Sequence, residues 1–498
     1  MEFKLKGDYI NGQFKAQNHQ KLLDKLCPGD TSMKLYELNI AKSDDVSSVE
    51  AADSSSKAWR RLGFEKRAEY LRAYQVEVEK RANEIAKAIA LETGKPLWEA
   101  KTEATALKSK VSVTLADSFE RIKRKTLSNV MPAIDGHILS KPLGVCLVIG
   151  PFNFPCHLAN GQILSALLTG NPIVFKPSEK TAYSTQLMME CFDTAKFPPG
   201  VINLVQGGAE TTQTLLKHPA VKGIYFTGSY PVGKAILNSV GADLNKLVAL
   251  ELGGKNATII HKDCKQEHGL AELLRACFLT AGQRCTSTSN IFIHRDIEQE
   301  FITRFVELTK KVIVGHPLSE LEPFMGPLID DNALQKFNDY TELGVKNGAK
   351  ILFNEAPLPS EFKGHYVSPH IHRLDKIDKK NPFALEEVFG PSCCFITYDD
   401  IDEAIDAANM TEYGLAASVF TQDKALFEHC LEEIEAGIIN LNRSTVGASA
   451  RLPFGGVKNS GNFRPAGVSI IDFTCHQVAS LETLDESSNL DTQKGLRN

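Results

Sequence analysis

The sequence has 498 residues, more than one compact domain usually contains, so two or three packed units are expected. Its composition, 43% hydrophobic and 23% charged, is that of an ordinary globular protein. A net charge of −5 gives no electrostatic basis for binding nucleic acid or an anionic membrane. The first residues do not form a secretion signal, and the most apolar stretch, 144–154, is too short to cross a bilayer. We therefore expect a cytoplasmic protein.

The sequence has eleven cysteines, an odd number, and no CxxC motif. This usage favours reduced thiols over disulfides or a zinc site, and no metal is expected. Most of the thiols, such as Cys146 and Cys277, stand among bulky apolar residues and are predicted to be inert parts of the core.

Apolar residues recur every three or four positions from about residue 45 to 125, which predicts helices, two of them over 65–81 and 82–92. Short apolar strands then alternate with helices. The predicted strands are 145–149, 172–175, 201–205, 222–226 and 247–252, and the predicted helices are 163–168, 185–194, 210–217 and 232–240. This alternation predicts parallel pairing and hence a Rossmann-like, doubly wound α/β sheet.

A second alternation follows Asn256. Strands are predicted at 291–294 and 394–396, and helices at 301–314 and 401–409. The pattern indicates a second α/β domain from roughly 255 to 440. Residues 125–140 and 467–482 fit neither rhythm and are expected to be extensions that pair with another subunit. The polar residues 486–498 are expected to form a flexible tail.

Polar residues stand where the predicted strands of the first sheet end. They are Asn153, Lys176, Glu179, Gly228 and Glu251. Ligands of a doubly wound sheet bind at this edge. Gly228, Ser229 and Gly233 open a helix and would let backbone amides approach a diphosphate, although a plain helix cap explains the same residues. Lys176 and Glu179 suit the hydroxyls of a ribose, with a surface turn as the alternative.

Cys285 differs from the other cysteines because no large apolar residue flanks it in 282–289. A neighbouring cation, Arg284, or nearby backbone amides would lower the pKa of its thiol and favour the nucleophilic thiolate. We therefore predict a nucleophile at Cys285, with an exposed structural cysteine as the alternative.

Two further residues suit catalysis. Glu251 ends an apolar strand, where burial raises the pKa of a carboxyl group and suits it to act as a general base. Asn153 lies between Pro151 and Pro155 and is expected to be a buried amide that donates a hydrogen bond to an oxyanion. A salt-bridged glutamate and a turn-forming asparagine are the alternatives.

Taken in order, these segments resemble the aldehyde dehydrogenase superfamily. The matching segments are 150–155, 176–179, 226–233, 251–255, 282–285, 386–391, 413–415 and 453–456. The resemblance covers nearly the whole chain, and eight ordered motifs are not expected by chance.

The resemblance implies a mechanism and a domain plan. Cys285 would add to the aldehyde, Asn153 would hold the oxyanion, and Glu251 would activate the water that hydrolyses the thioester. Glu387 and Phe389 would bind the nicotinamide end of the cofactor, and Glu179 favours NAD over NADP. Residues 1–124 and 141–254 would bind NAD, 255–440 would be catalytic, 441–466 would form loops at the substrate and cofactor edge, and 125–140 with 467–485 would assemble a homodimer or homotetramer.

Two stretches, 151–161 and 442–449, the latter followed by 460–466, are similar to the N-succinylglutamate 5-semialdehyde dehydrogenases of arginine degradation. This similarity places His157, Asn160, Arg443 and Arg464 near the substrate, where guanidinium groups suit carboxylates. A structural role for both arginines stays open, as does a different anionic semialdehyde such as succinate or glutamate semialdehyde. A catalytically silent homologue, a thiol redox sensor, and acyl transfer to phosphate or coenzyme A are the remaining alternatives.

Overall fold

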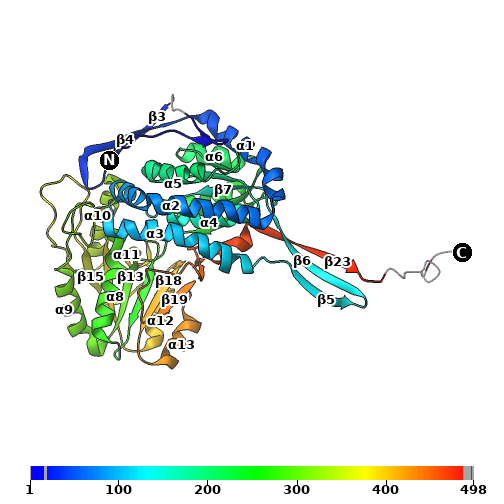
Figure 1. Ribbon diagram of the computed structural model, residues 1–498. Coiled ribbons are helices and arrows are strands. Elements are labelled where there is room, and N and C mark those ends of the chain that lie inside the picture. The colour runs from blue at the N-terminus through cyan, green and yellow to red at the C-terminus, as the bar shows by residue number, and fades with distance from the viewer. Residues whose placement is uncertain (1, 16–19, 486–494, 496–498) are drawn as a thin grey trace.

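The computed structural model describes residues 2–15, 20–485 and 495, and it contains two seven-stranded sheets (Figure 1). The first has the order β11-β10-β7-β8-β9-β1-β2. Its strands are β1 (Tyr9–Ile10), β2 (Gln13–Phe14), β7 (Val145–Ile149), β8 (Ile173–Lys176), β9 (Ile202–Leu204), β10 (Val221–Thr227) and β11 (Leu247–Glu251). Strands β7 to β11 are parallel, and β1 pairs antiparallel with β9 and β2.

Helices cover both faces of this sheet. They are α1 (Lys42–Arg61), α2 (Gly63–Thr93), α3 (Leu97–Val113), α4 (His157–Thr169), α5 (Ala182–Thr194), α6 (Ala209–Lys217) and α7 (Tyr230–Val240). Helix α6 contacts α1 and α7, whereas α2 contacts α3, α4 and α5. The predicted doubly wound α/β class is confirmed, because helices that alternate with parallel strands must cross over one face or the other.

The second sheet has the order β14-β15-β16-β13-β12-β18-β19, and only β14 is antiparallel to its neighbour. Its strands are β12 (Asn256–Ile260), β13 (Thr288–His294), β14 (Lys350–Phe353), β15 (His370–Leu374), β16 (Ser392–Tyr398), β18 (Ala416–Phe420) and β19 (Ile438–Leu441). Its helices are α8 (Gln266–Phe278), α9 (Glu298–Thr309), α10 (Asp331–Lys346), α11 (Pro382–Leu385), α12 (Ile401–Asn409) and α13 (Lys424–Glu433).

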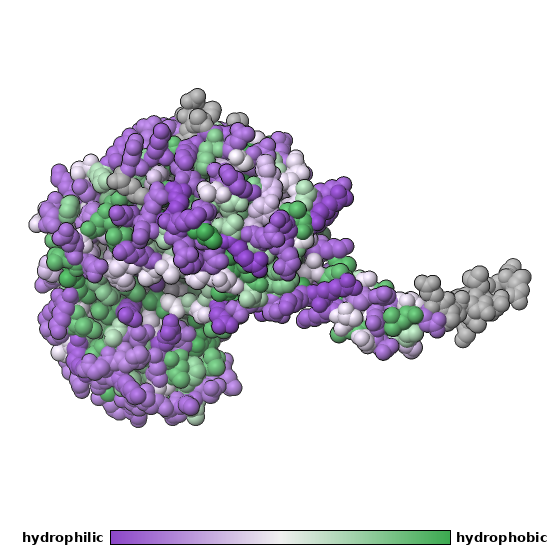
Figure 2. All heavy atoms as spheres, in the orientation of Figure 1, coloured by the Kyte–Doolittle hydropathy of each residue, from purple (hydrophilic) through white to green (hydrophobic). Residues whose placement is uncertain are grey.

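A three-stranded arm projects from the body of the molecule (Figure 1). It consists of β5 (Lys125–Met131), β6 (Ile134–Pro142) and β23 (Cys475–Thr483), which joins β6 from the far end of the chain. Apolar residues lie exposed on it among polar ones, as Figure 2 shows near the tip. The smaller pairs are β3 (Gln20–Cys27) with β4 (Asp30–Ile40), β17 (Tyr413–Gly414) with β21 (Val457–Lys458), and β20 (Pro453–Phe454) with β22 (Ala466–Gly467).

Some elements differ from the sequence-based expectation. The helix expected over 301–314 ends at Thr309, because Val314 leaves the helix and forms a β-bridge with Met325. The two helices expected over 65–92 form one, α2, and the β3–β4 hairpin was not predicted. Within the expected extension 467–482, residues Ser469–Phe473 form a 3-10 turn packed into the core, and the strand starts only at Cys475. Of the expected tail, 486–498, only residue 495 lies within the described part of the chain.

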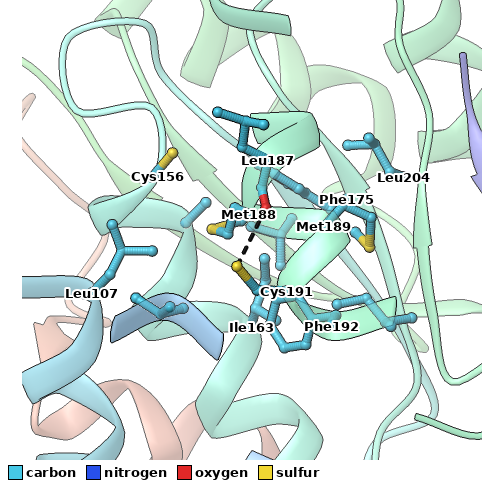
Figure 3. Packing of buried hydrophobic residues seen from close by; sticks show 14 of the residues in the cluster. Leu107, Cys156, Ile163, Phe175, Leu187, Met188, Met189, Cys191, Phe192 and Leu204 are labelled. Atoms are coloured by element: carbon cyan, nitrogen blue, oxygen red, sulfur yellow. Dashed lines mark hydrogen bonds between the residues drawn. The ribbon is translucent and has the colours of Figure 1, made fainter. Parts of the chain in front are cut away.

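The cysteines divide as predicted. Ten are buried and only Cys285 is partly exposed, and all eleven are free thiols. Figure 3 shows Cys156 and Cys191 among leucine, methionine and phenylalanine side chains, where the Cys191 thiol donates to the carbonyl of Leu187 at 3.4 Å. Burial raises the pKa of both thiols, which keeps them protonated and unreactive.

Candidate active site

Cys285 lies in the loop that enters β13, where the carboxyl edge of the first sheet meets the amino edge of the second. Its carbonyl accepts a hydrogen bond from Asn256 Nδ2 at 2.7 Å. A Cβ atom on Gly254 would come within 2.7 Å of that same carbonyl, so only glycine permits this approach. The turn after β11 therefore fixes the backbone that carries the thiol.

The surroundings of the Cys285 thiol favour its protonated form. Burial raises its pKa to about 12, and the nearby carboxyl groups of Glu251 and Glu387 add to the rise. Arg284 offsets this only in part, since its Nη2 is 2.6 Å from Glu99 Oε1. Arg284 acts in the expected direction, but burial outweighs it, so the prediction of a lowered thiol pKa was wrong for the protein without ligand.

Glu251 is the last residue of β11, with 5% of its surface exposed. Its Oε1 accepts a hydrogen bond from the Ala466 amide at 2.9 Å, while Oε2 is buried without a hydrogen-bond partner among the described residues. Burial raises the pKa of this carboxyl group well above its ordinary value, and the direction expected from the sequence is confirmed.

Asn153 is buried on the turn after β7, as predicted. Its Nδ2 donates to the carbonyl of Gln283 at 2.9 Å, which directs the side chain toward the Cys285 loop. Lys95 Nζ donates to the carbonyl of Asn153 at 2.7 Å and lies 3.7 Å from the centre of the Phe154 ring. One Asn153 amide proton is used by Gln283, and the second is available to an oxyanion.

Glu387 is the second carboxyl group that raises the pKa of the Cys285 thiol. Its Oε1 accepts a hydrogen bond from the Gly254 amide at 2.9 Å, and burial raises the pKa of its carboxyl group. A Cβ atom on Gly253 would lie 2.3 Å from Glu387 Oε2, so this glycine is required for the contact. Phe389 has a φ of +59° and packs its ring edge-on against Phe152 at 5.9 Å.

The residues expected to bind the adenosine and diphosphate parts of a cofactor stand at the ends of β8 and β10, the two strands that flank β7 in the first sheet. Lys176, at the end of β8, is buried and donates to the carbonyls of Pro177 and Gly207, both at 2.7 Å. Its third proton is free to reach a hydroxyl. The carboxylate of Glu179 forms no hydrogen bond or ion pair within the described residues. An acceptor and a donor suited to ribose hydroxyls thus stand three positions apart.

Helix α7 begins directly after the Gly228–Ser229 turn that ends β10. The Ser229 side chain does not cap the helix, so the first amides of its eleven residues have no side-chain acceptor. Gly233 allows the helix to lie close to β11, because a Cβ atom there would meet Leu252 at 2.6 Å. The arrangement suits a diphosphate at a helix N-terminus.

A cavity of about 440 Å³ opens beside Cys285. Its wall includes His157, and burial lowers the pKa of that imidazole to about 4. Asn160 is buried outside the wall, where its side-chain oxygen accepts a hydrogen bond from the Tyr74 hydroxyl and its nitrogen donates one to the carbonyl of Leu107. Arg443 is exposed and donates to the carbonyl of Gly447, a residue of the wall. Arg464 donates to Asn462 and is not part of the wall.

One face of α3 lines the cavity and was not predicted to do so. Four charged side chains on or near it were missed: Lys95, Glu99, Glu103 and Lys110. The spacing 99–103–110 places three of them on one helical face, but such a charged face is usually solvated, so its burial was not expected from the local pattern. Within residues 2–15, 20–485 and 495, no group of His, Cys, Asp or Glu could hold a metal ion, and no helix has the length and apolarity to cross a membrane.

The fold and this cavity define a class of two-sheet α/β proteins with a cysteine thiol at the junction of the sheets. The profile of the Aldehyde dehydrogenase family matches residues 14–479, and the chain belongs to that family. It is 36% identical over 480 residues to N-succinylglutamate 5-semialdehyde dehydrogenase of Legionella pneumophila (strain Corby), covering 96% of this chain and 95% of the relative.

Solved structures agree with this membership. An NAD-dependent aldehyde dehydrogenase from Sinorhizobium meliloti superimposes with a TM-score of 0.92 at 27% identity, covering 99% of this chain and 97% of the other. Betaine aldehyde dehydrogenase from Staphylococcus aureus, in complex with NAD+, has a TM-score of 0.91 at 26% identity, with 98% and 97% coverage. The predicted enzyme class, an aldehyde dehydrogenase that uses NAD, is confirmed.

Proposed function

We propose that this protein oxidises an aldehyde to a carboxylic acid through a thioester on Cys285, with NAD as the oxidant. The observation that carries the proposal is the meeting of two buried carboxyl groups, Glu251 and Glu387, at one thiol beside a 440 Å³ cavity. One carboxyl oxygen of Glu251 has no hydrogen-bond partner among the described residues, which leaves it available to take a proton from water.

The first step forms the bond from Cys285 Sγ to the carbonyl carbon, while the carbonyl electron pair moves to oxygen and the thiol proton is released to solvent. The second amide proton of Asn153 and the backbone N–H of Cys285 donate to this oxyanion. The carbonyl then re-forms as the hydride leaves carbon, giving a thioester. Glu251 takes a proton from water as the water oxygen attacks the thioester, and the carbon–sulfur bond breaks to release the acid. The Cys285 thiolate that leaves then receives this proton back from Glu251, which restores both groups.

The residues present fit a nicotinamide dinucleotide. We assign Lys176 and Glu179 to the adenosine ribose, the turn Gly228–Ser229 with Gly233 to the diphosphate, and Glu387 with Phe389 to the nicotinamide ribose. The free proton of Lys176 and the unengaged carboxylate of Glu179 support the first assignment. Bound NAD supplies the acceptor for the hydride. The negative charge of Glu179 would repel the 2′-phosphate of NADP.

For the substrate we propose N-succinylglutamate 5-semialdehyde. Relatives of that name match this chain at 36% identity over 96% and 94% of its length, and the cavity is large enough for an extended polar molecule. His157 lies in the cavity wall, and Arg443 stands behind the wall residue Gly447, where it suits a carboxylate near the entrance. Asn160 would contribute indirectly by positioning α4. Arg464 would reach the substrate only if its loop moves.

The test is NADH formation with purified protein and a panel of aldehydes. N-Succinylglutamate 5-semialdehyde is expected to give the highest kcat/KM, above succinate semialdehyde, glutamate semialdehyde and uncharged aldehydes. Cys285→Ala should abolish turnover on every substrate yet keep NAD binding, measured by quenching of protein fluorescence, whereas the distant Cys264→Ala should retain turnover. Turnover by Cys285→Ala would refute the proposed nucleophile, and a preference for another aldehyde would refute only the substrate.

The domain roles follow the same division. We propose that 1–124 and 141–254 bind NAD, that 255–440 form the catalytic domain with 441–466 at its edge, and that 125–140 with 467–485 assemble subunits in the cytoplasm. Leu127 and Leu481 both pair with Gly136 and so share one face of the arm, at 50% and 61% exposure. A thin sheet with an exposed apolar row supports burial against a second copy of the chain.

A further inference from the structure

Lys110 is a buried cation in the wall of the cavity. It lies on α3 with 4% of its surface exposed, and its Nζ donates to the carbonyl of Gly467 at 2.8 Å. It forms no ion pair with any described residue. Burial lowers the pKa of its ammonium group to about 8, which is still above neutrality. An ammonium with two unused protons inside a cavity is costly unless something negative binds there.

The other charges of the wall are already neutralised. Glu103 forms an ion pair with Lys95 at 2.7 Å, with both side chains fully buried. Arg284 pairs with Glu99 at 2.6 Å. These two pairs cancel, so the described wall of the cavity carries one net positive charge, and it belongs to Lys110. No carboxylate of the described residues pairs with that charge.

The surroundings leave room for this side chain and add a polar atom beside it. A Cβ atom on Gly161 would lie 3.0 Å from Lys110 Cε, so the glycine in α4 lets the lysine stem pass. His157 lies one turn earlier in α4, and its Nδ1 is buried without a hydrogen-bond partner among the described residues. The positive charge of Lys110 is one cause of the lowered pKa of His157, which places the two groups close together.

We propose that Lys110, with His157 beside it, binds a carboxylate at the end of the substrate remote from the aldehyde, and that Lys110 thereby selects anionic semialdehydes. This inference rests on the proposed function. Glu99, which holds the neighbour of Cys285, and Lys110 lie eleven positions apart on α3, or about 16 Å along a helix axis. Lysine side chains lean toward the helix N-terminus, which shortens that gap. The spacing suits the terminal carboxylate of an elongated substrate better than that of a four-carbon semialdehyde.

A purely structural role would be different. The hydrogen bond to Gly467 ties α3 to β22, and a lysine used only for that tie would affect all substrates equally through stability. If Lys110 binds the substrate carboxylate, its loss raises KM for carboxylate-bearing substrates. The ratio of their kcat to that of neutral substrates then stays unchanged. The measurable quantity is therefore the ratio of kcat/KM for an anionic semialdehyde to kcat/KM for its uncharged methyl ester.

The experiment compares wild type, Lys110→Met and the control Lys101→Met, an exposed lysine of the same helix. The substrates are N-succinylglutamate 5-semialdehyde and its methyl esters, with glutarate semialdehyde and its ester as a shorter pair. Lys110→Met should lower the anionic-to-ester ratio by about 10- to 100-fold, mainly through KM, as expected for losing a charge-assisted hydrogen bond. Lys101→Met should leave the ratio as in wild type. Gly161→Ala, which crowds the lysine but keeps its charge, should lower the ratio as well.

A second readout does not need turnover. N-Succinylglutamate should slow alkylation of Cys285 by iodoacetamide in wild type and protect it much less in Lys110→Met. An unchanged ratio together with equal protection overturns the role of Lys110. The wild-type enzyme could fail to oxidise N-succinylglutamate 5-semialdehyde yet prefer glutarate semialdehyde over its ester. That result would refute the proposed substrate, and the effect of Lys110→Met on the ratio for the shorter pair would then decide the role of Lys110. If the wild-type enzyme oxidises none of the aldehydes, the proposed function is refuted instead.

Discussion

Glu251 accepts a hydrogen bond at 2.9 Å from the backbone amide of Ala466, a residue 215 positions later in the chain. The next carbonyl, that of Gly467, accepts from Lys110. The dipeptide Ala466–Gly467 thus forms hydrogen bonds with both the proposed base, Glu251, and the cation of the cavity wall, Lys110. Because Ala466 occupies Oε1, the second oxygen of Glu251 remains for a proton.

Replacing Glu251 by glutamine should separate the two halves of the reaction. The amide oxygen can still accept from Ala466, but it cannot take a proton from water. We expect kcat to fall by about 100-fold or more, the usual scale for a lost general base, with thioester hydrolysis rate-limiting. Rapid mixing with NAD should then show a burst of NADH followed by a slow phase. A steady-state rate equal to that of wild type would argue against the assigned role.

The same residue makes stability depend on pH. Its folded-state pKa is raised above the ordinary 4.5, so the folded chain retains a proton that the unfolded chain releases. Stability therefore falls as pH rises above about 4.5 toward the folded pKa, by up to about 1.4 kcal/mol per pH unit. Glu251→Gln, which cannot ionise, should unfold at a higher temperature than wild type at pH 8 and gain less at pH 5. The exposed Glu320→Gln should show no such difference.

The reactivity of Cys285 should also follow pH. With a pKa raised to about 12, only a small fraction of the thiol is ionised at neutral pH in the protein without NAD. Alkylation of Cys285 by iodoacetamide, followed by peptide mass spectrometry, should accelerate about tenfold per pH unit between pH 7 and 9. A plateau in that range would mean a thiolate formed at an ordinary or lowered pKa. Glu387→Gln should raise the rate, since it removes one of the nearby carboxyl groups.

Glu179 should control the choice of cofactor. Glu179→Ser removes the carboxylate that would face a 2′-phosphate, and the ratio of kcat/KM for NADP to that for NAD should rise at least about tenfold. The exposed Glu361→Gln serves as the charge-matched control and should keep the wild-type ratio. If Glu179→Ser leaves the ratio unchanged, the adenosine ribose is held elsewhere.

The arm should govern association. Leu127→Glu with Leu481→Glu places two charges in the exposed apolar row beside Gly136, and burying them against a second subunit would be unfavourable. Sedimentation analysis should show a lower mass for this double variant than for wild type. Lys125→Ala, also exposed on β5, should behave like wild type. An unchanged mass would mean that subunits do not meet through this row.

Local sequence was sufficient for much of the fold and for the identity of the reacting groups. Alternation of apolar segments predicted the first sheet, because parallel strands buried on both faces leave a continuous apolar signature. The β3–β4 hairpin escaped, because its strands are largely exposed and mix charges with apolar residues. Cys285 was distinguished by its small polar neighbours, and Glu251 by its position at the end of an apolar strand, and the expected direction of the Glu251 pKa is confirmed.

The sequence by itself determined the strand–helix order and the residue types at the strand ends, since both depend on periodicity along a short segment. Only the tertiary structure decided which groups face one another. Arg284 is adjacent to Cys285 in sequence and forms an ion pair with Glu99 of α3, but burial of the thiol outweighs its effect and raises the pKa. From the sequence, Lys110 is expected to be a solvated charge on a helix. In the structure, α4 and the loop at Gly467 enclose it beside the cavity. Pairing and burial depend on segments hundreds of positions apart, and they set the electrostatics of the site.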